Sequence, residues 1–407
     1  MWNMINIVYS GLAVIFYWYF YIKTKDKLNP FGVFLFIWYF SAAIATLYLS
    51  SYQQTWSLEM HLVVLLSGIS FFFGSFIFMR PRKLNRQQIK LKCNKTYIYL
   101  TRFIFVVALS SFVIELYYND WTFALLVQNQ FDIKSTIEGV PIIHYGTILL
   151  PFCAIFSIYE LLAIKKSIFY NIFVLFITVV YTILFQVSRG FFLIPFLAFI
   201  FLINVNQKLN FKKIIILVII FITIMSAIFL IRVNEGSLMY ELSGNSIWGR
   251  IFSSTYLYIS MGYENLRKLV EMDLPYHLNL GASFRFLWRI LGMQGYTEIE
   301  KIQTPFFNQL TYLYEFYYDL NIFGTVFFPF IIAMILSLLY RWMYINSYFI
   351  ILLAALQKAV FSSFFGNYFF EYFVLLWPYI ICFIVILVSS GMKLPNIILR
   401  CSPFFGQ

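Results

Sequence analysis

The apolar residues of this 407-residue chain are gathered in long runs separated by short polar segments. A helix that crosses a bilayer needs about 20 consecutive, mostly apolar residues. Runs of this kind predict about eleven membrane-spanning helices, at residues 4–22, 30–50, 61–79, 98–117, 141–163, 168–187, 190–206, 213–231, 320–340, 347–365 and 371–390. We therefore expect an all-α, polytopic integral membrane protein.

The composition supports this class. Hydrophobic residues make up 62% of the chain and charged residues only 11%, whereas soluble domains are about half apolar and about one quarter charged. A water-soluble globular protein is therefore excluded.

The distribution of charge predicts the orientation of the spans. The chain has 29 Lys and Arg residues against 17 Asp and Glu, a net charge of +12, and 18 of the 29 follow the first, third, fifth, seventh, ninth and last predicted spans. Asp26 is the only acid in these connections. Cytoplasmic loops of membrane proteins carry an excess of Lys and Arg, so we expect the N-terminus outside and the C-terminus inside. The positive charge then reports topology, and no nucleic-acid partner is expected.

One predicted outer connection is much longer than the others. The segment 232–319 spans about 85 residues, and loops of this length are usually functional. Its glycines alternate with apolar stretches, which favours short helices lying against the membrane. We therefore divide the chain into a bundle of about eight spans (1–231), a large outer loop (232–319), and about three spans with a cytoplasmic tail (320–407).

Several arginines lie on the predicted outer side. Within the large loop, Arg285 and Arg289 are four residues apart and would share one helix face. These residues have two interpretations: they anchor helices by extending toward the lipid headgroups, or their planar guanidinium groups bind a lipid-linked phosphate or diphosphate. The candidates are Arg189, within Ser188-Arg189-Gly190, and Arg232, Arg250, Arg267, Arg285 and Arg289.

The outer segments also supply candidate proton acceptors. Transfer of a group to a hydroxyl needs a base, and a carboxylate commonly serves. Asp319 and Glu315 are the best placed, four residues apart at the entrance to the ninth predicted span. Most other outer acids are expected to be solvated loop residues. His277, on the large loop, is a second candidate for a base or a sugar ligand.

Other polar residues carry weaker signals. His61 and His144 fall on separate outer segments, and the histidines and four cysteines lack metal-ligand spacing, so no metal is predicted. Lys358 lies inside the tenth predicted span, where a charged residue is either functional or paired with a carboxylate such as Glu371. The chain has no glycine-rich nucleotide loop, so no nucleotide or other cofactor is expected.

The segment from Thr304 to Gly324 resembles the end of the large outer loop in O-antigen polymerases of the Wzy family, which are bacterial oligosaccharide repeat-unit polymerases. Tyr317-Tyr318-Asp319 and Gly324 fit the family pattern of two aromatics, Asp and a Gly entering a span. Asn321 stands where small residues or glycine are common. Ser188-Arg189-Gly190 resembles the Arg-Gly element before a mid-chain span. The family's Arg-x10-Gly motif is one residue short here, from Arg285 to Gly295.

This resemblance implies an enzyme of the bacterial inner membrane with its active site on the periplasmic side. It would transfer a growing glycan from undecaprenyl diphosphate to a new lipid-linked repeat unit without a cofactor. Arg189 and the loop arginines would neutralise the leaving diphosphate, Asp319 or Glu315 would activate the acceptor hydroxyl, and Tyr318 would contact sugar rings. A chain-length regulator and a flippase are the implied protein partners.

Two other functions share parts of this plan. An O-antigen ligase uses the same lipid-linked donor, but its His-x10-Gly motif fails here because Trp288 stands eleven residues after His277. A lipid-linked oligosaccharide flippase or another transporter would show similar halves and no large outer loop.

Overall fold

The structure is a computed structural model, and it describes residues 2–79, 89–123, 140, 142–164, 167–186, 188–207, 209–217, 219–220, 223, 247–272, 277–278, 280–291, 304, 307, 309–369 and 373–391. These residues form helices and no strand, which confirms the predicted all-α class. Within these ranges, seven helices are long and apolar enough to cross a membrane, namely Met4–Thr24, Leu58–Ser75, Lys95–Tyr118, Ile143–Ile164, Ile168–Phe185, Gly190–Gln207 and Tyr314–Ile345. The chain thus has the helices of a multi-pass membrane protein.

Three further apolar helices are shorter. They are Pro30–Ala45, Phe349–Phe361 and Leu375–Ser390, and they correspond to the predicted spans at 30–50, 347–365 and 371–390. The eighth predicted span, 213–231, begins as a helix at residues 211–217, and most of its remainder lies outside the described residues. The structure therefore shows seven full-length candidates where the sequence predicts about eleven.

Contacts along the chain define two compact units, and each draws on both halves of the sequence. Unit 1 comprises residues 1–85, 252–341 and 359–376, and unit 2 comprises residues 86–251, 342–358 and 377–407. Four of the described helices therefore contribute residues to both units. They are α12 (Ile247–Val270), α15 (Tyr314–Ile345), α16 (Phe349–Phe361) and α17 (Phe373–Ser390).

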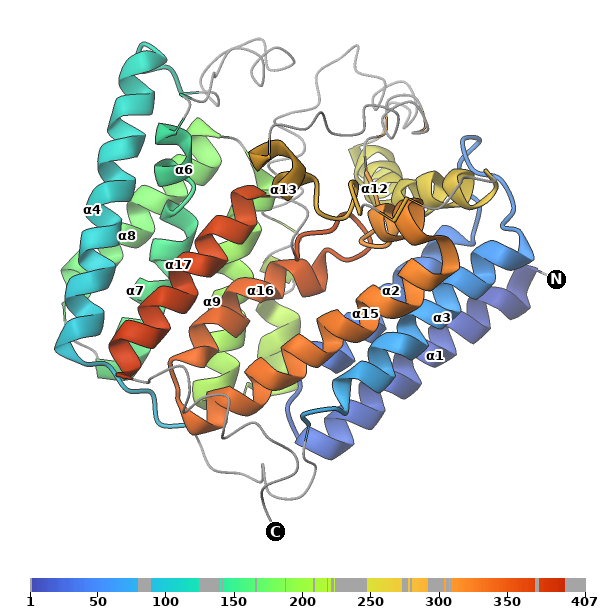
Figure 1. Ribbon diagram of the computed structural model, residues 1–407, viewed down its shortest axis with the longest axis horizontal. Helices are drawn as coiled ribbons and strands as arrows, with labels where there is room; N and C mark the ends of the chain where they lie inside the picture. The colour runs from blue at the N-terminus through green and yellow to red at the C-terminus, as the bar shows by residue number, and fades with distance from the viewer. Residues whose placement is uncertain are drawn as a thin grey trace. The chain divides into compact units, whose positions relative to one another are not determined.

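Unit 1 is built on three helices that follow one another along the chain. Helix α1 (Trp2–Thr24) packs on α2 (Pro30–Ala45), and α2 packs on α3 (Leu58–Ser75), as Figure 1 shows. Asn29 caps α2 by accepting hydrogen bonds from two backbone N–H groups, and Pro30 occupies the first helical position, where it loses no hydrogen bond. The first 28 residues of α15 belong to this unit, where Tyr340 contacts Phe31 edge to face.

Helix α15 bends where the sequence predicts the ninth span to begin. The helix starts at Tyr314, but Leu320 and Asn321 have non-helical backbone angles, with φ 48° at Asn321. Positive φ favours glycine, and Asn is among the few other residues enriched there. This backbone angle gives a physical reason for the small residues expected at this position.

Within the described residues, two helices lie entirely inside the predicted large outer loop. Helix α12 has 24 residues, so it is longer than the short helices predicted for this loop. Helix α13 (Arg285–Ile290) has six. Tyr263, Leu266 and Leu269 of α12 are fully buried in unit 1, so this part of the predicted loop contributes to the core.

Unit 2 surrounds helix α7 (Leu150–Ile164). Helices α4 (Lys95–Tyr118), α8 (Ile168–Val179) and α9 (Arg189–Gln207) pack against it, and the short helix α6 (Ile143–Thr147) packs on α4. Every residue of α7 from Leu150 to Glu160 is buried, which explains why the segment is apolar on all sides. The predicted span 141–163 is thus divided into α6 and α7, with Pro151 in the first turn of α7.

Candidate functional site

The predicted arginine cluster is only partly described. Arg285 is the first residue of α13 and its side chain is half-buried. Arg289 lies four residues later in the same helix, so the predicted helical spacing is confirmed for this pair. For Arg189, Arg250 and Arg289 only the backbone is described, and Arg232 lies outside the described residues.

Asp319 holds the turn that leads into α13. One carboxylate oxygen accepts a hydrogen bond from the backbone N–H of Ala282 at 3.1 Å, and the other accepts one from Ser283 at 2.7 Å. Asp319 is fully buried, and hydrogen bonds to a charged acceptor are stronger than neutral ones. Because Arg285 follows two residues after Ser283, Asp319 fixes where α13 begins. This geometry fits a positioning residue for Arg285.

His277 and Tyr318 lie beside this carboxylate. The backbone N–H of His277 donates to the carbonyl oxygen of Asp319 at 2.7 Å, and the His277 imidazole stacks on the ring of Tyr318 with centroids 4.9 Å apart. Glu315 lies one turn before Asp319, is buried, and accepts a hydrogen bond on its backbone carbonyl from Ser283 Oγ at 3.4 Å. Unit 1 thus brings these predicted site residues together around one turn of α15.

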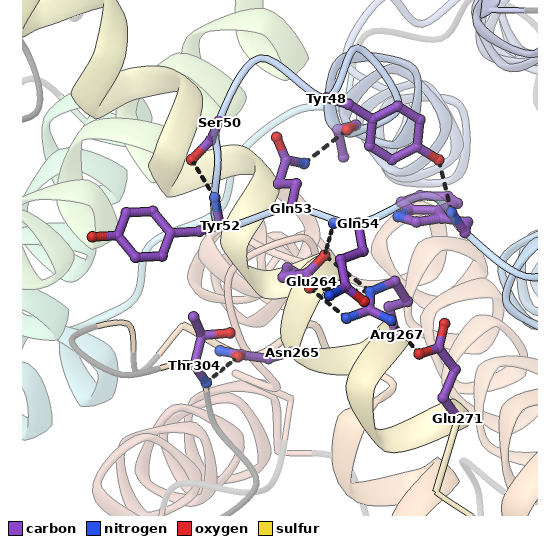
Figure 2. Close-up of polar contacts among 12 residues, drawn as sticks. Tyr48, Ser50, Tyr52, Gln53, Gln54, Glu264, Asn265, Arg267, Glu271 and Thr304 are labelled. Carbon is purple, nitrogen blue, oxygen red and sulfur yellow. Dashed lines mark hydrogen bonds and ion pairs between the residues drawn. The ribbon is translucent and has the colours of Figure 1, made fainter.

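A second polar cluster in unit 1 surrounds Arg267 of α12 (Figure 2). Its guanidinium binds Glu264 through Nε and Nη2, at 3.0 Å and 2.7 Å, and Glu271 through Nη1. Burial acts to lower the pKa of Arg267, but the hydrogen bonds and charges of the two carboxylates outweigh it and raise the pKa. Arg267 therefore stays charged and serves an internal ion pair, unlike an arginine available to a phosphate.

The same stretch of α12 also forms hydrogen bonds with two loops. Glu264 accepts a hydrogen bond from the backbone N–H of Gln54 at 3.3 Å, and Asn265 accepts one from Thr304 at 2.7 Å. The Asn265 amide also donates to the carbonyl oxygens of Phe307 and Gln309. These side chains supply hydrogen-bond partners to backbone N–H and C=O groups in the loops, which have no partner within a helix or a strand. The cluster is structural.

In unit 2, Ser188-Arg189-Gly190 joins a π-helix to α9. The π-helix (Val180–Phe185) continues α8, and the Ser188 N–H donates to the Thr182 carbonyl oxygen at 3.0 Å. Ser188 Oγ then accepts from the N–H of Phe191 at 3.4 Å, as an N-cap residue does. π-Helical turns are frequent at functional sites.

Lys358 of α16 lies against this junction. A Cβ placed on Gly190 would lie 3.5 Å from Lys358 Nζ. Lys358 Nζ is also 5.7 Å from the ring centroid of Phe191. Lys358 is 5% exposed. The sequence identifies Lys358 as an unusual residue within a span, but nothing in its spacing indicates that it meets the Ser188–Gly190 element.

A histidine and a carboxylate also meet in unit 2. His144 Nδ1 is 2.8 Å from Glu115 Oε1, which joins the start of α6 to the end of α4. The Glu115 side chain is 1% exposed, whereas the His144 side chain is 31% exposed. The sequence favours His277 over His144 as a base or sugar ligand and contains no signal for the contact with Glu115, because residues 29 positions apart on different helices leave no pattern.

No group of three or more His, Cys, Asp or Glu side chains that could hold a metal ion occurs within the described ranges. No protein-family model, curated protein or solved structure matches the chain.

Proposed function

We propose that this chain is an O-antigen polymerase, a membrane glycosyltransferase that extends a surface polysaccharide on a lipid carrier. The observation that carries the proposal is the Asp319 contact with the turn before α13. It holds Arg285 near the head of α15, a helix able to cross a membrane. A diphosphate attached to a lipid lies at headgroup depth, where a helix of this kind ends.

The proposed reaction needs charge stabilisation above all. An acceptor sugar hydroxyl attacks the anomeric carbon of the donor glycan, a C–O bond forms, and the C–O bond to the diphosphate breaks with its electron pair on oxygen. Preorganised cations that face the developing charge accelerate such a step. We assign this role to Arg189, Arg232, Arg250, Arg285 and Arg289, with His277 and Tyr318 as sugar contacts. Asp319 positions Arg285.

The proposal includes a location and partners. The chain would lie in the bacterial inner membrane with about eleven spans, its N-terminus and active site facing the periplasm and its C-terminus in the cytoplasm. Its donor and acceptor would be oligosaccharides on undecaprenyl diphosphate, delivered by a flippase. A chain-length regulator would act beside it.

Deletion of the gene and inspection of the lipopolysaccharide ladder test this function. We expect core capped with a single repeat unit, because ligation continues without polymerisation. Bare core with accumulated lipid-linked polymer would instead indicate a ligase. Bare core without polymer would indicate a flippase, and an unchanged ladder would contradict all three.

Variants of α13 test the arginine role in the complemented deletion strain. Arg285→Ala should abolish polymer while the protein remains in the membrane, and Arg285→Lys should restore little because an ammonium lacks the two-pronged geometry. Leu287→Ala is the matched control, since Leu287 is an exposed residue of the same helix. Equal ladders from Arg285→Ala and Leu287→Ala would contradict the proposed phosphate contact.

A further inference from the structure

The Glu115–His144 pair has the geometry of an oriented proton acceptor. A carboxylate accepts hydrogen bonds, so the 2.8 Å contact makes Nδ1 the ring nitrogen that donates to Glu115. Nε2 is the ring nitrogen that this contact leaves out. A histidine fixed through Nδ1 by a buried carboxylate is the arrangement in which an imidazole takes a proton from a hydroxyl group.

The two side chains differ in their access to solvent. Glu115 is buried at the end of α4, and its Oε2 atom has no hydrogen-bond partner in the described part of the chain. His144 is 31% exposed and lies at the start of α6. The carboxylate is thus buried, while part of the imidazole is accessible.

The surrounding backbone is built to bring α6 onto α4. A Cβ on Gly146 would lie 2.8 Å from Ser111 Cβ and closer still to its Oγ, so only glycine permits this approach. Ile142, two residues before His144, has φ 69°. Positive φ is an outlier for a β-branched residue, and such strained residues gather at functional sites.

A continuous row of aromatic contacts joins this pair to Lys358 within unit 2. Phe112, one turn before Glu115 on α4, contacts Tyr181 of the π-helix, and Tyr181 contacts Phe191 of α9. The ring of Phe191 lies 5.7 Å from Lys358 Nζ. One unit therefore combines a histidine held by a carboxylate with a buried lysine.

We propose that His144 is the general base of the polymerisation step and that Glu115 is its positioning residue; this inference rests on the proposed function. His144 Nε2 takes the proton of the acceptor hydroxyl as its oxygen bonds to the anomeric carbon and undecaprenyl diphosphate leaves with the electron pair. Glu115 stabilises the imidazolium that forms. The proton then passes to water, which restores the neutral ring. This assignment leaves Asp319 free for its contact with the turn before α13.

The test uses the full-length protein purified in lipid nanodiscs and supplied with lipid-linked repeat units. General base catalysis contributes about 10²–10⁴-fold to a rate, so His144→Gln should lower kcat by that factor while KM and the melting temperature Tm stay close to wild type. Glutamine is the informative replacement because its amide can still donate to Glu115 but cannot take up a proton. His61→Gln is the matched control, since His61 bonds the Tyr9 hydroxyl in unit 1.

Two further measurements separate a base from a structural contact. Imidazole added to His144→Ala should restore part of kcat, and it should not restore Arg285→Ala. Glu115→Gln should lower kcat with little change in KM. Wild-type activity in His144→Gln would overturn the base. A wild-type protein that cannot extend the lipid-linked substrate would overturn the polymerase proposal, and the base with it.

Discussion

Gly324 of α15 gives the sharpest test of how the head of this helix is built. The bend at Leu320 and Asn321 brings the first turns of the helix back over Gly324. A Cβ on Gly324 would lie 2.8 Å from the carbonyl carbon of Phe316, closer still to its oxygen, and 3.1 Å from Leu320 Cβ. Ordinary contact begins at 3.4 Å, so Gly324→Ala requires a separation of at least 0.6 Å, and most of it must come from backbone.

The expected cost follows from this overlap. Overpacking a well-packed site costs about 1–3 kcal/mol. Gly11→Ala is the matched control, because Gly11 is also within a helix of unit 1 and has nothing within 4 Å of a new Cβ. Alanine is favoured over glycine in a helix by roughly 1 kcal/mol, so the control should be neutral or slightly stabilised. The helix preference applies to both positions, so the two variants should differ by the overpacking cost, about 1–3 kcal/mol in free energy of unfolding.

Unfolding of the detergent-purified variants by titration with SDS, followed by tryptophan fluorescence, measures this difference. Gly324→Ala should also lose polymerising activity, since Asp319, which positions Arg285, lies on the displaced turn and a misplacement of about 1 Å can cost roughly 10²-fold in rate. Equal unfolding free energies for Gly324→Ala and Gly11→Ala would refute the close contact. Lost activity at unchanged stability would show that the helix bends without strain.

Two other perturbations test buried polar groups. Arg267→Ala leaves the buried Glu264 uncompensated and should lower the free energy of unfolding by about 3–5 kcal/mol. Glu271→Ala removes a partner whose side chain is 39% exposed and should lower it by about 1 kcal/mol or less. SDS titration measures both losses, and equal values would contradict the unequal burial. Burial, and then the charge of Glu160, raises the pKa of the Cys93 thiol to about 11. Its alkylation by iodoacetamide, followed by mass spectrometry, should therefore be slow at pH 8 and accelerate about tenfold per pH unit up to that pKa. A fast rate of alkylation at pH 8 would contradict this environment.

The helices could largely be predicted from the sequence because a bilayer constrains the length and polarity of each span directly. Their ends and internal breaks depend on packing. The division of the predicted span 141–163 has a local signal in Pro151, which is favourable in a first turn and unfavourable further inside. The bend of α15 has a weaker one, since Asn321 tolerates positive φ but does not require it.

Some polar contacts could likewise be predicted from the sequence, whereas others depend on packing. Arg285 and Arg289 share a helix, so their spacing alone predicts a common face. Asp319 meets Ser283 across 36 residues and Glu115 meets His144 across 29, and such contacts depend on which helices pack together. A single sequence contains no periodic signal for that choice. Asp319 could therefore be identified from the sequence as a candidate site residue, while its partner Ser283 could not.

Burial separates the charged residues that hold the fold from those that can act on a substrate. Arg267 and Glu264 are both at most 3% exposed and satisfy each other, and Asp319 is fully buried with both oxygens bound to backbone N–H groups. Breaking such contacts is costly, so these groups are poorly suited to exchange protons with a ligand. In the pair of Glu115 and His144, only the carboxylate is buried. A proton acceptor in this protein is therefore expected where one partner of a buried contact remains accessible, and His144 meets that condition.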